Sequence, residues 1–264
     1  MLKKMTEFVL KDGSDPGKIA VILGSGLGGF ADRLTDSTII SYETIPHYPQ
    51  SNVEGHHGKL VFGKYQNIKV TVAKGRFHYY EGYELETVRI PVYLFARMGI
   101  KTLFITNAAG SCSKSIPPGT IMLIKGHMDC TFRERPSAPE LVTQKPYYDI
   151  NVLDRVRSVA KNLNVNMQEG IYCWTLGPAY ETPAEISYLK GVGADAVGMS
   201  TVPEIQCAAE LGMRIIAIST ITNFAAGITG EPLTHDEVIQ TADKVKPDFI
   251  ELIGGLIKTF GDDN

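Results

Sequence analysis

The sequence has few cysteines and no cysteine motif. The four cysteines of the 264-residue chain are widely spaced and form no CxxC pair; they are Cys112, Cys130, Cys173 and Cys207. This spacing argues against a zinc site and against a disulfide framework. It also suits a reducing compartment, so we expect a cytoplasmic protein.

Long apolar runs and a strong charge of either sign are lacking as well. The first fifteen residues mix lysines with acids and contain no apolar stretch typical of a secretion signal. The uncharged segment 215–230 is too short, and too rich in Ser, Thr and Asn, to predict a membrane span. The formal net charge is −3 and the pI is about 6.1, which gives no general attraction to nucleic acid or to an anionic membrane. We therefore expect small-molecule partners.

What the sequence does contain is an alternation of strand-like and helix-like segments. Short apolar runs predict strands at 18–23, 60–62, 68–73, 101–106, 120–124, 170–176, 194–199 and 213–220. Helical spacing predicts helices at 84–98 (broken early by Pro91), 151–163, 184–189, 202–211 and 234–260. The segment 130–148 reads as a long loop. This order predicts a single α/β domain over residues 1–264, with a mixed and largely parallel sheet.

Small and polar residues follow many of these predicted strands. Because ligands bind beyond the carboxyl ends of the strands in open α/β sheets, these residues predict a site. Within the stretch VTVAKGRFHYYEGY, an extended chain would place Arg76, His78 and Tyr80 on one face. With Ser25, the Ala108 amide and Ser200 they would offer mainly hydrogen-bond donors and one fixed positive charge, which suits a bound phosphate. Ser200 has an alternative role as a simple helix N-cap.

A second group of residues suits a purine. Tyr180 supplies a ring, Glu181 a carboxylate, Met199 a flexible apolar surface, and Asn223 an amide with donors and an acceptor. A 6-oxopurine offers a π face and an N1–H that a carboxylate can accept. The structural alternatives are a first-turn helix carboxylate for Glu181 and a loop-capping amide for Asn223.

Two other motifs predict different chemistry. The segment GSGLGG satisfies GxGxxG after a strand, and Glu43 lies where a ribose-binding acid is expected, which leaves a nucleotide-cofactor enzyme as an alternative. However, 30–34 is very short for the crossover helix of that fold, and 35–37 reads as a turn. His56 and His57 suggest a metal, but no HExxH or carboxylate cluster accompanies them, so we expect no metal site.

Seven motifs in this order resemble the purine nucleoside phosphorylases of the trimeric type. They are GSGLGG, VEGHHGKLVFG, GRFHYYEGY, TNAAG, GPAYETPAE, GADAVGMSTVPE, and TN followed by PLTHDEV. The resemblance implies a mixed, partly closed sheet flanked by helices, usually assembled as a homotrimer with sites near the subunit interfaces. It also implies a division of the site residues. Phosphate would be bound by Ser25, Arg76, His78, Ala108 and Ser200, with His56 close by. The nucleoside would be bound by Tyr80, Met199, His235, Tyr180, Glu181 and Asn223.

The implied reaction is reversible phosphorolysis of purine (2′-deoxy)ribonucleosides. Inorganic phosphate would be a co-substrate, with no cofactor, and the catalytic residues would be Asn223, Glu181 and His78. Relatives that use 6-aminopurines carry Asp where this chain has Asn223, so we expect inosine and guanosine to be preferred to adenosine. The segment 111–148 departs from the family pattern, and Tyr147 or Tyr148 is a candidate for the aromatic that this region lends to a neighbouring subunit. A nucleosidase and a non-enzymatic purine-binding protein remain as alternatives.

Overall fold

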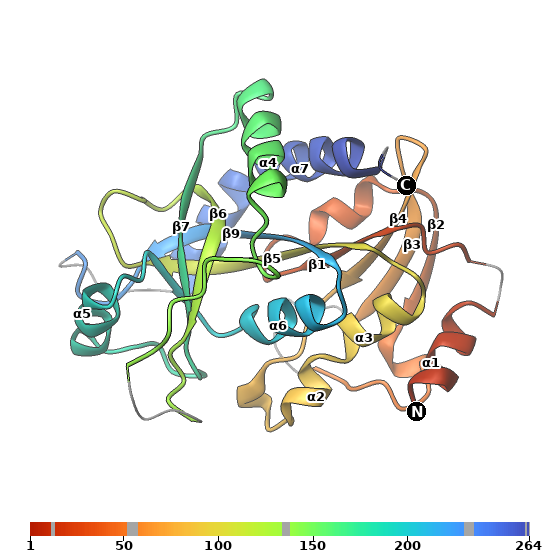
Figure 1. Cartoon of the computed structure of the whole chain (residues 1–264), viewed down its shortest axis with the longest axis horizontal. Helices are drawn as coiled ribbons and strands as arrows, with labels where there is room; N and C mark the ends of the chain where they lie inside the picture. Colours follow the sequence, from red (N-terminus) through yellow and green to blue (C-terminus); the bar gives the residue numbers. More distant parts are fainter. Residues whose placement is uncertain (12–13, 52–57, 134–137, 230–234, 262, 264) are drawn as a thin grey trace.

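A mixed β-sheet forms the centre of the protein and is covered by helices on both sides (Figure 1). The computed structural model describes residues 1–11, 14–51, 58–133, 138–229, 235–261 and 263. The strands are β1 (Ile19–Leu23), β2 (Thr35–Ser41), β3 (Lys59–Tyr65), β4 (Ile68–Lys74), β5 (Thr102–Ser111), β6 (Ile121–Asp129), β7 (Met167–Trp174), β8 (Ala196–Gly198) and β9 (Arg214–Phe224). The α-helices are α1 (Leu2–Val9), α2 (Leu85–Val88), α3 (Ile90–Arg97), α4 (Ile150–Asn162), α5 (Pro183–Gly191), α6 (Val202–Glu210) and α7 (His235–Gly261).

The sheet closes partly on itself through β5. Strands β4, β1, β5 and β9 are parallel neighbours, while β2 and β3 extend the sheet antiparallel beyond β4. Beyond β5 the strand order runs through β8, β7 and β6 to β9, which also pairs with β5 directly. The expectation of a mixed, partly closed sheet is therefore confirmed. Every residue of β1 is buried, as expected for a parallel strand covered on both faces.

Most predicted elements are present, but several boundaries were wrong. Residues 35–37, read as a turn, begin β2, and the N-terminal helix α1 was not predicted. Strands β5, β6 and β9 run four or five residues beyond their predicted ends. The break near Pro91 is present, since α2 ends at Val88 and α3 begins at Ile90. In the part of the chain that the structure describes, no helix is long and apolar enough to cross a membrane.

The expectation that the cysteines form no disulfide was wrong for one pair. Cys130 directly follows β6, and Cys173 lies in the neighbouring strand β7, opposite Met128. This parallel pairing brings two cysteines that are 43 residues apart in sequence into one disulfide. Cys112 and Cys207 are free and buried.

A buried histidine in β6 makes stability depend on pH. His127 is 2% exposed, and its Nδ1 lies 2.8 Å from the hydroxyl of Tyr148. Burial lowers the pKa of His127 from 6.5 to about 4, so the folded protein holds a neutral ring where the unfolded chain would take up a proton. The resulting stability is fully present above pH 6.5 and is lost as the pH falls towards 4. We expect a loss of about 3 kcal/mol in the free energy of unfolding from this group.

Urea unfolding at intervals between pH 7.5 and 4.5 measures this loss. The control is His127→Gln, which keeps a polar side chain that does not titrate, and its stability should change less over the same range. An equal slope of stability against pH for the two proteins would contradict the prediction.

Tyr148, whose hydroxyl contacts His127, is itself buried in the interior of the chain. Its side chain is only 6% exposed.

Candidate active site

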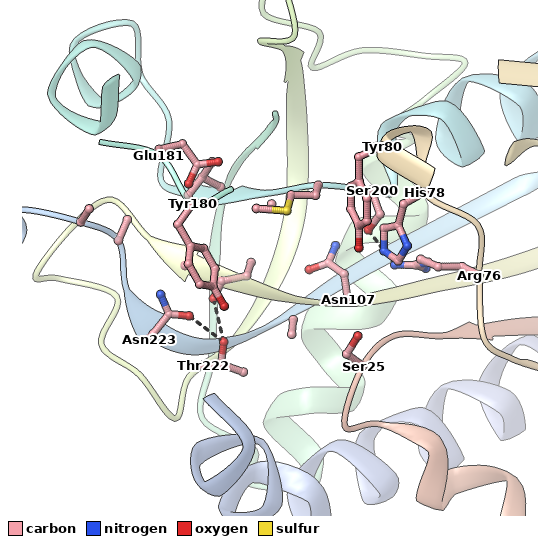
Figure 2. A pocket seen from close by; sticks show the side chains of 18 residues that line it. Ser25, Arg76, His78, Tyr80, Asn107, Tyr180, Glu181, Ser200, Thr222 and Asn223 are labelled. Atoms are coloured by element: carbon pink, nitrogen blue, oxygen red, sulfur yellow. Dashed lines mark hydrogen bonds between the residues drawn. The ribbon is translucent and has the colours of Figure 1, made fainter. Parts of the chain in front are cut away.

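One cavity of about 170 Å³ lies where the ends of β5, β8 and β9 meet the segments that follow β1 and β4 (Figure 2). Its lining includes these predicted site residues: Ser25, Arg76, His78, Tyr80, Ala108, Tyr180, Glu181, Met199, Ser200 and Asn223. His56 and the side chain of His235 lie outside the described residues. The two predicted halves of the site therefore share one cavity.

The guanidinium of Arg76 contacts Ser200, Thr201 and Glu204. Its Nη1 donates to the hydroxyl of Ser200 at 2.9 Å and to that of Thr201 at 3.3 Å. Its Nε lies 3.3 Å from a carboxylate oxygen of Glu204, and both side chains of this ion pair are 1% exposed. Burial raises the pKa of Glu204, although the charges of Arg76 and His78 lower it. The cavity thus has a positive charge at a fixed position at one end.

A strained turn places the two hydroxyls beside Arg76. Thr201 has φ 79° and ψ −48°, and the amide of Val202 donates to the carbonyl of Ser200 at 2.9 Å. Such a γ-turn conformation is rare and strained, and strain of this kind is concentrated at functional sites. The structural alternative for Ser200 was wrong, because Thr201 occupies the N-cap position of α6 and neither side chain caps the helix. The turn instead places both hydroxyls where they accept hydrogen bonds from Arg76.

His78 and Tyr80 reach the same end of the cavity. The chain is extended at His78 and then forms a short 3₁₀ turn over Tyr79–Glu81, so the predicted common face ends at His78. The turn nevertheless brings Tyr80 back, and its ring stacks on that of His78 with centroids 4.8 Å apart. Glu81 accepts a hydrogen bond from the backbone amide of His78 at 2.7 Å and lies 3.2 Å from Nδ1. Burial and the charge of Glu81 raise the pKa of Tyr80 to about 12, so its hydroxyl remains protonated well above neutral pH.

The glycine-rich segment after β1 brings Ser25 close to β5. A Cβ on Gly24 would lie 2.7 Å from the Cα of Asn107, so only glycine permits this approach. The backbone amide of Gly24 also donates to the Thr106 hydroxyl at 3.2 Å. The segment continues as a 3₁₀ helix over Gly28–Arg33, not as the crossover helix of a dinucleotide-binding unit. The alternative reading of GSGLGG is therefore not supported.

At the other end of the cavity, Glu181 and Asn223 are each held by a threonine. The hydroxyl of Thr175 donates to Glu181 Oε1 at 2.5 Å, and that of Thr222 donates to Asn223 Oδ1 at 2.9 Å. Asn223 belongs to β9 and is not a loop cap, while Glu181 precedes the N-cap residue of α5. Neither structural alternative for these two residues therefore describes the fold.

Sequence reasoning missed several contributors. Asn107 and Thr222 line the cavity, and Asn107 is 2% exposed with its Nδ2 bonded to Thr201 at 2.9 Å. Asn107 belongs to the motif TNAAG and Thr222 to the motif TN. If β5 and β9 had been predicted at their full length, the alternation of side chains along each strand would have assigned both residues to the cavity. Nothing in the sequence separates Thr175 or Glu204 from ordinary structural residues. Among the described side chains, no group of three or more His, Cys, Asp or Glu is arranged to hold a metal ion.

Comparison with known proteins identifies the family. The profile of the Phosphorylase superfamily matches residues 18–258. Purine nucleoside phosphorylase 1 of Bacillus subtilis is 39% identical over 98% of both chains, and that of Geobacillus stearothermophilus is 40% identical over 97% of this chain and 96% of the relative. The chain belongs to the purine nucleoside phosphorylases of this superfamily. The mammalian purine nucleoside phosphorylase of Rattus norvegicus is 38% identical over 92% of this chain and 89% of its own length.

Solved phosphorylase structures share the fold. A schistosome purine nucleoside phosphorylase in complex with hypoxanthine has a TM-score of 0.87 and 32% identity, covering 97% of this chain and 96% of that one. The Schistosoma mansoni enzyme in complex with inosine has a TM-score of 0.88 and 31% identity, covering 97% and 95%. The same enzyme has also been solved with adenosine, at a TM-score of 0.84 and 33% identity, covering 96% of both chains.

Proposed function

We propose that this phosphorylase catalyses the reversible phosphorolysis of 6-oxopurine (2′-deoxy)ribonucleosides, such as inosine and guanosine. The products are the free base and (deoxy)ribose 1-phosphate. The observation that carries the proposal is the division of one cavity into two chemically different ends. Arg76 and hydroxyl donors lie at one end, and a carboxylate and an amide lie at the other.

The anion-binding end is assigned to inorganic phosphate. Ser25, Arg76, His78, the Ala108 amide and Ser200 would hold it, with His56 close by. The His78 ring would donate to phosphate while its Nδ1 side is oriented by Glu81. Phosphate would attack C1′ of the sugar and at the same time neutralise the positive charge that develops there. A covalent enzyme intermediate is then not needed, and phosphate acts as a co-substrate without a further cofactor.

The other end is assigned to the base. Tyr180 would pack on the purine, Glu181 would accept N1–H, and Asn223 would stabilise N7 and O6 as negative charge develops on the leaving base. Tyr80 and Met199 also line the cavity and would contact the sugar, with His235 assigned to the 5′-hydroxyl. Because the amide of Asn223 can donate to O6, we expect inosine and guanosine to be cleaved well ahead of adenosine.

We further propose that the enzyme is a homotrimer that acts in the cytoplasm. Large apolar side chains are exposed beside the base end, among them Phe132, Tyr180 and Tyr188, each more than 40% exposed. Sedimentation at about three chain masses is expected, and a monomer would contradict the assembly.

The redox state of one cysteine pair tests the compartment. In a reducing cytoplasm Cys130 and Cys173 would be held as two thiols. Both side chains are buried, so cells are quenched in acid and the protein is unfolded before thiols are alkylated and analysed by mass; Cys130 and Cys173 that remain unalkylated would contradict that location.

Inosine cleavage with and without inorganic phosphate tests the function. Purified protein should release hypoxanthine only when phosphate is present, with ribose 1-phosphate as the second product. Equal release without phosphate would identify a nucleosidase. Hypoxanthine binding without any release would identify a purine-binding protein, and either result would overturn the proposal.

A further inference from the structure

The carboxylate assigned to the base is fixed by a residue outside the cavity lining. Thr175 directly follows β7 and is 8% exposed. Its backbone amide donates to the carbonyl of Gly198 in β8 at 2.9 Å, so its main chain is held by the sheet. Its side chain then reaches Glu181, six residues further along the chain, at 2.5 Å. The sheet is thereby connected to the base-binding segment through one hydroxyl group.

Counting hydrogens assigns the direction of this contact. A threonine hydroxyl has a single hydrogen, whereas an ionised carboxylate can only accept. Two acceptors lie near the hydroxyl of Thr175: Glu181 Oε1 at 2.5 Å and the carbonyl of Gly198 at 3.3 Å. The shorter distance and the negative charge both favour donation to Glu181, because hydrogen bonds to ionised groups are shorter and stronger.

No second protein group holds this carboxylate within the described residues. Thr175 is the one donor that contacts Glu181 there. Glu181 itself is only partly buried, in the segment that joins β7 to α5, and its neighbour Tyr180 is 52% exposed. A glutamate side chain that is free to rotate loses conformational entropy when it orders around a ligand. The bond to Thr175 orders it before the base arrives.

We propose that Thr175 is a positioning residue that presents the Glu181 carboxylate to the N1–H of a 6-oxopurine. The proposal rests on the function proposed above. Because the hydroxyl engages Oε1, the carboxylate is oriented with its remaining acceptor capacity available to the base. Thr175 thereby contributes to the selection of bases that carry N1–H over bases that do not. It acts through Glu181 and does not contact the substrate.

Thr175→Val tests this role, because valine keeps the shape of threonine and removes the hydroxyl. We expect kcat/KM for inosine to fall roughly tenfold, mainly through KM, since the contact to N1–H exists before as well as during the reaction. Purine riboside has no N1–H, so its kcat/KM should change less than about twofold on the same physical grounds. Thr175→Ser restores the donor and should restore the discrimination between the two nucleosides.

The matched control is Thr102→Val. Thr102 lies at the start of β5, is fully buried, and within the described residues its hydroxyl has no hydrogen-bond partner. The same substitution at Thr102 should change kcat/KM for neither inosine nor purine riboside. An equal loss on inosine and purine riboside in Thr175→Val, without recovery in Thr175→Ser, would show a merely structural role and overturn the proposal. An unchanged KM for inosine would overturn it as well.

Calorimetric binding of free bases separates this proposal from the function on which it rests. Thr175→Val should bind hypoxanthine roughly tenfold more weakly than wild type and should bind purine about equally well. This result does not depend on turnover. If wild type binds hypoxanthine but does not cleave inosine, the proposed function fails while Thr175 is still tested. If Thr175→Val binds hypoxanthine and purine as tightly as wild type does, the positioning role fails even where phosphorolysis is observed.

Discussion

Glu204→Gln is expected to lower the free energy of unfolding by about 3–5 kcal/mol, because it removes the carboxylate that faces the buried charge of Arg76. Arg76 and Glu204 are each 1% exposed, so water cannot take the place of the carboxylate. The guanidinium cannot lose its proton to escape this cost. Urea unfolding of wild type and variant at pH 7.5 measures the difference.

Removing the other partner, in Arg76→Met, should lower the free energy of unfolding by less. In Arg76→Met the remaining partner is Glu204, whose pKa is already raised by burial, so the carboxyl group can become neutral by taking up a proton. Inorganic phosphate provides a second check. As a negative ligand beside Arg76, it should stabilise Glu204→Gln more than it stabilises wild type. Equal costs for the two single variants, with no difference in the effect of phosphate, would contradict the assignment of a fixed buried charge.

Asn223→Leu is expected to reduce kcat for inosine by about 10²–10³, which corresponds to about 2.7–4 kcal/mol of barrier. The amide of Asn223 is held by Thr222 at 2.9 Å and by the carbonyl of Phe224 at 3.0 Å. It is therefore oriented before the base accumulates negative charge and costs no reorganisation during the reaction. Leucine keeps a similar size but cannot donate to O6. Steady-state rates at saturating phosphate measure the loss.

Two further variants show whether that loss of rate comes from the missing amide donor. Asn151→Leu makes the same substitution at an exposed position of α4 and should leave the rate unchanged. Asn223→Asp replaces the donor by an acceptor, so its ratio of adenosine to inosine cleavage should rise. A fall of less than about tenfold in Asn223→Leu would show that the amide does not stabilise the leaving base.

The sequence predicted the cavity better than it predicted the strands around it. The residues of TNAAG look like a loop because they are small and polar, yet they continue β5 because β9 pairs with them as far as Ser111. The same pairing places Thr222 and Asn223 inside β9. Strand ends are set by neighbours that are distant in sequence, so local propensity cannot define them. The predicted site residues whose side chains the structure describes nevertheless line one cavity, because their chemical types do not depend on those boundaries.

Contacts that depend on register could not be predicted. The disulfide between Cys130 and Cys173 requires the parallel pairing of β6 with β7, which spacing along the chain does not reveal. The bond from Thr175 to Glu181 depends on how the segment after β7 turns back towards the sheet. The conformation of Thr201 has no sequence signal either, because a threonine at φ 79° runs against its own preference.

The two ends of the cavity are connected by a single strand. In β5, Asn107 lies beside Thr201 at the Arg76 end of the cavity, and Gly110 lies close to the amide of Asn223 at the other end. These residues are three positions apart, which corresponds to about 10 Å of extended chain. Strand β9 pairs with both positions, with one irregularity in register between Ala109 and Gly110, so the neighbouring strand holds this interval. Under the proposed function, the backbone thus sets the spacing between phosphate and purine before either substrate arrives, and a molecule in which base and sugar are further apart would not bring C1′ to the nucleophile.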